Sequence, residues 1–95
     1  MVNMKLLVIY KPDSEYARSV ETFVHDFEKR HGSLVRKIEV VNSQSRDAMA
    51  TMSLYDIMQQ PVIMALTDDG QLLQHWTGPD MPLLDDVASY FVSGQ

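Results

Sequence analysis

Two unbroken apolar runs constrain the fold of this chain more than any other feature of its sequence. The first run is Leu6–Tyr10 and the second is Val62–Leu66. In neither run do apolar residues alternate with polar ones, and a short continuous run is typical of a strand that is covered on both faces of its sheet. The two runs therefore predict buried strands in an α/β fold, with helices lying against the sheet.

The stretch after the first run has the pattern of an amphipathic helix. Pro12 ends the strand, and Asp13 or Ser14 can cap a helix. His31 lies in the last turn of this helix and Gly32 stops it. The apolar residues fall on one helical stripe, which consists of Tyr16, Ala17, Val20, Phe23, Val24 and Phe27.

The middle of the chain predicts a second strand and a shorter helix. Leu34–Val41 reads as a strand, and a strand, a helix and a strand with short connections predict a parallel pair. Asn42 or Ser43 can cap a helix that runs to about Leu54. Its predicted inner face consists of Ala48, Met49 and Met52, and we interpret these methionines as adaptable core residues.

The last third of the chain predicts a hairpin followed by a helix. Asp68–Gly70 is a turn signal, and Gln71–Thr77 returns as a fourth strand. Gly78–Asp80 breaks the chain and caps the last helix, with Pro82 in its first turn, where a missing N–H is harmless. The order is βαβαββα in one domain, residues 1–95. The stripe of the last helix consists of Leu83, Leu84, Val87, Ala88 and Phe91.

Charge and composition narrow the classes of partner. The chain has 8 basic and 13 acidic residues, a net charge of −5 and a pI near 4.9. Such a field repels phosphate backbones and anionic lipid, so we expect no nucleic acid and no membrane among its partners. The apolar run near the start is too short for a signal peptide or a membrane span, which predicts a cytoplasmic protein. There is no cysteine, hence no thiol chemistry and no thiolate metal site.

Two stretches resemble the thioredoxin/glutaredoxin-like superfamily. LLVIYKPDSEYAR is similar to the glutaredoxin pattern of an apolar strand, a tyrosine, a proline-containing turn and a Cys-x-x-Cys motif that opens a helix. On that pattern Ser14 and Ala17 occupy the two cysteine positions. The run Tyr55–Met64, followed by Asp69-Gly70 and Gly78, resembles the thioredoxin succession of Tyr-Gly-Ile, proline, apolar strand, turn, strand and glycine. The chain is thus similar to a superfamily member that lacks the Cys-x-x-Cys motif.

The resemblance implies a thioredoxin-like fold, in which helices flank a central four-stranded mixed sheet. It also implies a cis peptide bond between Gln60 and Pro61, beside the cysteine positions, where backbone groups bind an extended substrate or glutathione. A buried acid that some redox-active thioredoxins carry on the first strand corresponds to Val8 here. The binding surface implied by the resemblance consists of Tyr10, Lys11, Ser14, Glu15, Tyr16, Ala17, Gln60, Pro61, Gly78 and Asp80.

These observations predict a redox-inactive module that binds a protein or an extended peptide, with no catalytic residue and no cofactor. A helix N-terminus is worth about 0.3–2 kcal/mol and cannot ionise the Ser14 hydroxyl at neutral pH, so dithiol–disulfide chemistry is excluded for this chain acting alone. Ser14 is interpreted first as a helix cap. One alternative is a glutathione-type small-molecule binder, or a transferase-like enzyme in which Ser14 donates a hydrogen bond to a bound thiolate. Another is a structural subunit that pairs through its sheet edge or a helix.

The histidines and the single tryptophan carry weaker signals. His25, His31 and His75 have no partner at ligand spacing, so we predict no metal site and interpret them as surface or helix-end residues. Trp76 either anchors a partner on a strand face or packs under the last helix.

Overall fold

The computed structural model describes residues 4–35, 37–78 and 81–92, and its elements follow the predicted order βαβαββα. One short 3₁₀ helix, Gly32–Leu34, follows the first α-helix. The elements are β1 (Met4–Tyr10), α1 (Ala17–His31), β2 (Lys37–Asn42), α2 (Arg46–Leu54), β3 (Val62–Thr67), β4 (Leu72–Thr77) and α3 (Leu84–Val92).

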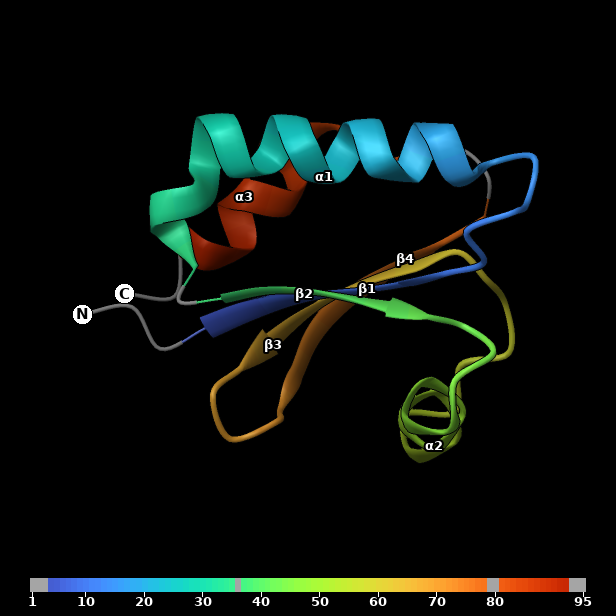
Figure 1. Cartoon of the computed structure of the whole chain (residues 1–95). Helices are drawn as coiled ribbons and strands as arrows, with labels where there is room; N and C mark the ends of the chain where they lie inside the picture. Colours follow the sequence, from blue (N-terminus) through green and yellow to red (C-terminus); the bar gives the residue numbers. More distant parts are fainter. Residues whose placement is uncertain (1–3, 36, 79–80, 93–95) are drawn as a thin grey trace.

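The strands form a four-stranded mixed sheet in the order β2-β1-β3-β4. β1 pairs in parallel with β2 and antiparallel with β3, and β3 pairs antiparallel with β4. The two unbroken apolar runs are therefore the two central strands, as their lack of alternation predicts. Helices α1 and α3 cover one face of the sheet and α2 covers the other (Figure 1). This arrangement confirms the predicted α/β fold with a mixed sheet between helices.

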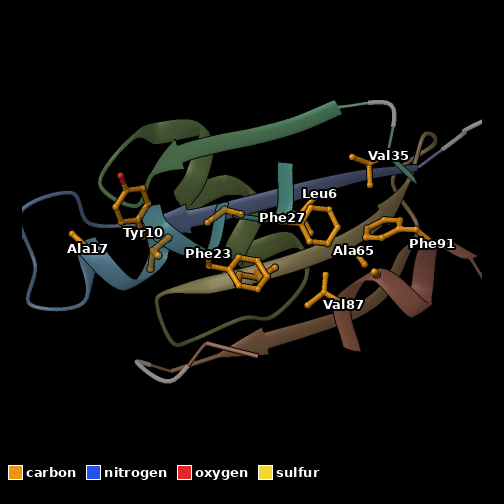
Figure 2. Packing of buried hydrophobic residues seen from close by; sticks show 13 residues of the cluster. Leu6, Tyr10, Ala17, Phe23, Phe27, Val35, Ala65, Val87 and Phe91 are labelled. Carbon is orange, nitrogen blue, oxygen red and sulfur yellow. The ribbon is translucent and has the colours of Figure 1, made fainter. Parts of the chain in front are cut away.

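The larger core lies between the sheet and helices α1 and α3. Leu6 and Val8 of β1 face this side, and both are fully buried. The ring of Phe27 is at its centre, with its centroid 6.1 Å from those of both Phe23 and Phe91 (Figure 2). Such ring distances are favourable for aromatic pairs, so one face of the sheet is closed by interlocking rings from two helices.

The smaller core lies between the sheet and α2. Leu7 and Ile9 alternate with the residues of the larger core and face this side, together with Met64. The Tyr55 hydroxyl donates to the carbonyl of Gly70 and so ties the end of α2 to the β3–β4 turn. Gly70 has a φ of +91°, which a residue with a side chain rarely adopts.

Several predicted boundaries and caps are wrong. β2 begins at Lys37 rather than Leu34, because residues 32–34 continue from α1 as a 3₁₀ helix. Helix α1 begins only at Ala17, so neither Asp13 nor Ser14 caps it; its N-cap position is Tyr16, without a side-chain bond. For α2, the cap is Ser45 rather than Asn42 or Ser43, and the Ser45 hydroxyl accepts from the N–H of Ala48 at 3.1 Å.

Two predicted core residues are exposed instead. Met49, assigned to the inner face of α2, is 60% exposed, and Leu83 is 70% exposed. α3 starts at Leu84, so Pro82 precedes the helix rather than lying in its first turn. The predicted break and cap at residues 79–80 lie outside the described residues. Among the helices described, none has the length and apolar character needed to cross a membrane.

Candidate functional site

Two connections that are far apart in the sequence meet at one end of the sheet. Ile9 pairs with Val62 in the antiparallel ladder, so the end of β1 lies beside the start of β3. The turn of residues 11–16, which leads into α1, and the segment of residues 55–61, which leads into β3, therefore leave the sheet at the same end (Figure 1). The N–H of Gly78 donates to the carbonyl of Pro61 at 3.1 Å, which brings the end of β4 there as well.

The turn before α1 is closed by its own hydrogen bonds. The Ser14 hydroxyl donates to the carbonyl of Lys11 at 2.6 Å, and the Ser14 N–H donates to the same oxygen at 3.1 Å. The N–H of Ala17 donates to the Ser14 carbonyl at 3.2 Å. Ser14 thus stabilises the turn with its hydroxyl, and it does not cap α1 through its side chain as the sequence predicted.

Tyr10 lies at the end of β1 with its ring in the larger core. Its hydroxyl donates to Glu21 Oε2 of α1 at 2.6 Å. This hydrogen bond, burial and the negative charge of Glu21 together raise the pKa of Tyr10 to about 12, because each disfavours the phenolate. The tyrosine is therefore a neutral link between strand and helix, and it is not part of the accessible surface.

The predicted surface is thus brought together only in part. Ala17 and Pro61 are buried like Tyr10, so their side chains support the surface from below. Asp80 lies outside the described residues. The members that remain accessible at this end of the sheet are Lys11, Ser14, Glu15, Tyr16, Gln60 and Gly78.

Among the accessible members of the predicted surface, Gln60 is the closest to β3 in the sequence. The Gln60–Pro61 peptide bond is cis, as the resemblance implies. The side chain of Gln60 is exposed, and its backbone N–H and C=O form no hydrogen bond with another described residue. Beside it, the Thr77 hydroxyl donates to Gln59 Oε1 at 3.3 Å. Just before β3 begins, the chain therefore has a backbone N–H and a backbone C=O that no other described residue pairs with.

A hollow of about 400 Å³ lies next to Gln60 and was not predicted from the sequence. Of the two methionines that the sequence assigns to the core, Met49 is 60% exposed; Met58, for which the sequence makes no prediction, is 87% exposed. The spacing of the methionines gives no sign of this, because α2 is short and its helical pattern weak. The hollow is lined by Ser43, Met49, Met52, Ser53, Asp56, Ile57, Met58 and Gln60.

The contacts of the histidines and Trp76 can be compared with the alternatives that the sequence left open. His31 Nε2 is 3.3 Å from Asp85 Oδ1, while His25 and His75 are exposed. In the parts of the chain that are described, no three His, Cys, Asp or Glu side chains gather where they could hold a metal ion. The Trp76 ring packs edge-on against Tyr90 of α3, with centroids 5.5 Å apart, which is the packed alternative for this residue.

Comparison with known proteins places the fold. No protein-family model and no curated protein matches the sequence. Thioredoxin from Fasciola hepatica has a TM-score of 0.69 at 13% identity, covering 98% of this chain and 82% of its own. The thioredoxin Deadhead from Drosophila melanogaster has a TM-score of 0.70 at 12% identity, with coverages of 98% and 82%. Thioredoxin f2 from Chlamydomonas reinhardtii has a TM-score of 0.68 at 12% identity, with coverages of 100% and 82%.

At such low identity these likenesses concern the path of the backbone and not the activity of the proteins. They are consistent with a four-stranded sheet that has helices on both faces. They also point to the same fold as the two stretches of sequence that resemble the superfamily. Ser14 and Ala17 stand where that resemblance puts its two cysteines. The chain therefore has the thioredoxin-like fold, and its 95 residues include no cysteine from which a Cys-x-x-Cys motif could be made.

Proposed function

We propose that this chain binds an extended segment of a partner protein at the end of the sheet where residues 11–16 meet residues 60–61. The observation that carries the proposal is that Gln60 is an exposed residue whose backbone N–H and C=O are unpaired among the described residues. An extended segment laid alongside can exchange main-chain hydrogen bonds with it, as an added strand does with a sheet edge. No redox step is part of this function.

The neighbouring side chains suit a peptide better than a buried small molecule. Tyr16 is half-buried against the larger core, which holds its ring in place while leaving part of it accessible. Lys11 and Glu15 carry opposite charges on the same turn, so they provide a polar rim of mixed sign. An aromatic anchor within a polar rim is the usual composition of a protein-binding surface.

The glutathione and transferase alternative depends on the Ser14 hydroxyl, and its hydrogen bond counts against that role. A hydroxyl has one proton to donate, and that of Ser14 is directed to the Lys11 carbonyl at 2.6 Å. To stabilise a bound thiolate, Ser14 would have to break this bond and leave the carbonyl without it. The cost of that exchange makes the main-chain surface at Gln60 the stronger candidate.

The test is a titration of ¹⁵N-labelled protein with peptides selected from a random hexapeptide library on phage. We expect amide shifts at residues 11–16 and 60–62, and weaker binding when the central peptide amides are N-methylated, because methylation removes the pairing N–H groups. Gln60→Arg should weaken binding, whereas Gln71→Arg, at the exposed β3–β4 turn, is the matched control.

Three results would contradict the proposal. The first is a set of amide shifts confined to other surfaces, and the second is affinity that N-methylation leaves unchanged. The third is a glutathione titration that shifts Ser14 and Tyr16 while the selected peptides do not, since it would favour the small-molecule alternative.

A further inference from the structure

The hollow beside Gln60 is open to solvent and has a mixed lining, with four apolar residues and four polar ones, Ser43, Ser53, Asp56 and Gln60. Its apolar lining comes from Ile57 and from three methionines of α2 and the following segment, Met49, Met52 and Met58. Its volume of about 400 Å³ lies within the range typical of ligand pockets. Met49 and Met58 are 60% and 87% exposed and line the same hollow, so their apolar surface lies together beside Gln60.

The shape of the hollow is fixed by the backbone that follows α2. Asp56 has a φ of +57°, a conformation that aspartate tolerates better than most residues, and it reverses the chain there. The N–H of Asp56 donates to the Ser53 carbonyl at 3.2 Å, and the N–H of Ile57 donates to the Met52 carbonyl at 2.8 Å. Ile57 is thereby turned into the smaller core, while Met58 is left at the rim. These backbone hydrogen bonds set the backbone positions of Met52 and Met58, while their unbranched side chains have several rotatable bonds.

Ser43 contributes an unpaired hydroxyl to the wall of this hollow. The residue is only 6% exposed, and its Oγ is buried with no hydrogen-bond partner among the described residues. Its N–H is used, because it donates to the Tyr10 carbonyl at 2.8 Å, but its side chain is not. Ser45, and not Ser43, caps α2. A buried hydroxyl without a partner is destabilising. Because Ser43 Oγ is covered by its neighbours, a ligand group pairs with it only after wall side chains move aside, and it then gains a hydrogen bond without breaking one that this hydroxyl makes.

We propose that this pocket binds a tyrosine side chain of the extended segment, with the ring against the methionines and the phenol bonded to Ser43 Oγ. The thioether sulfur interacts favourably with aromatic rings, and the unbranched methionine side chains can move aside to admit one. A phenol can both donate to and accept from the serine hydroxyl. Gln60 lines the hollow, and its backbone is where the proposed function pairs the extended segment. A segment paired there therefore has one of its own side chains within reach of the hollow. The inference rests on the function proposed above and names the side chain that the site selects.

The experiment compares two capped alanine peptides that differ only at the centre, one carrying tyrosine and the other phenylalanine. Binding is followed in one sample through the methyl resonances of Met49, Met52 and Met58 and through the amides of residues 11–16 and 60–62. In the native chain the tyrosine peptide should bind roughly 2- to 10-fold more tightly than the phenylalanine peptide, the range expected for one hydrogen bond. In Ser43→Ala the two peptides should bind equally. Ser33→Ala, an exposed serine in the 3₁₀ helix, should keep the preference.

The outcomes separate this inference from the proposed function. Amide shifts near Gln60 without methionine methyl shifts would refute the tyrosine pocket and leave peptide binding in place. Equal affinities in the native chain, or a preference for tyrosine that survives Ser43→Ala, would also overturn it. If phage-selected peptides shift resonances near Gln60 but neither alanine peptide does, the tyrosine pocket alone is refuted. Failure of every peptide refutes both proposals. The comparison in the native chain does not depend on how well the variant folds.

Discussion

The two faces of the sheet differ in how completely their cores are filled. On the face of α1 and α3, thirteen of the described residues form one buried cluster, which includes Phe23, Phe27 and Phe91. On the face of α2 the buried cluster has seven described residues, none of them aromatic. Hollows occur on both sides of the sheet: those beside α2 have volumes of about 350 and 400 Å³, and those beside α1 have volumes of about 730 and 250 Å³. The first face therefore supplies most of the packing energy, whereas the second has the smaller core and leaves two methionines, Met49 and Met58, exposed beside one of its hollows.

The sharpest way to break this comparison is to truncate one fully buried residue on each face. Phe27→Ala should cost about 3–5 kcal/mol of unfolding free energy, because it leaves a cavity among rings that cannot collapse together. Met64→Ala, on the face of α2, should cost about 2–3 kcal/mol, near the low end of the range for such truncations, because its flexible surroundings can close in. Urea unfolding measures both.

Equal costs for the two truncations would contradict the difference between the faces. A larger cost for Met64→Ala would reverse it. Because Phe27→Ala removes a large part of the stability of a chain of this size, its native fold should first be verified by near-ultraviolet circular dichroism.

The sequence predicts the first face better than the second for a physical reason. The stripe of α1 is long and regular, so burial of Val20, Phe23 and Phe27 follows from helical period alone. α2 has nine residues and a weak pattern, and its methionines are equally compatible with a core and with a surface; Met49 was therefore misplaced. At the candidate site, the strand ends could be predicted because the ladder brings them together. The unpaired hydroxyl of Ser43 could not, since it depends on which of several nearby serines caps α2.

The link between Tyr10 and Glu21 allows the first face to be tested through pH. Below pH 10 the phenol is protonated in the folded and the unfolded chain, so the full contribution of its hydrogen bond to stability is present. Between pH 10 and about 12 the unfolded chain loses the proton while the folded chain keeps it, so stability falls, and above about 12 the contribution is lost. Tyr10→Phe should be less stable than the native chain by about 1–2 kcal/mol below pH 10.

The measurement is urea unfolding of the native chain and Tyr10→Phe across this pH range. The difference between them should shrink as the pH rises toward 12. A difference that stays constant would mean that the phenol contributes by packing alone, because only the hydrogen-bonded proton makes it depend on pH.

A pair of serines tests the second face more finely. Ser45→Ala should destabilise the chain by about 1 kcal/mol, because it removes the hydroxyl that accepts from the N–H of Ala48. Ser43→Ala should leave the unfolding free energy unchanged or raise it slightly, because the hydroxyl that it removes has no partner among the described residues. The two substitutions delete the same atom two positions apart, so each controls for the other. A cost for Ser43→Ala as large as that for Ser45→Ala would show that the Ser43 hydroxyl is paired in solution.

The smallest effect on stability should come from the exposed methionines, and it decides how the second face is to be understood. Met49→Gln and Met58→Gln keep the length of the side chain and remove the sulfur from residues that are 60% and 87% exposed. If they serve binding rather than folding, each variant should unfold within about 0.5 kcal/mol of the native chain and bind the tyrosine peptide more weakly. A loss above about 1 kcal/mol, of the size expected when apolar area leaves a core, would mean that the methionines close over the hollow in solution. The second face would then be a filled core like the first, and the contrast between the two faces would disappear.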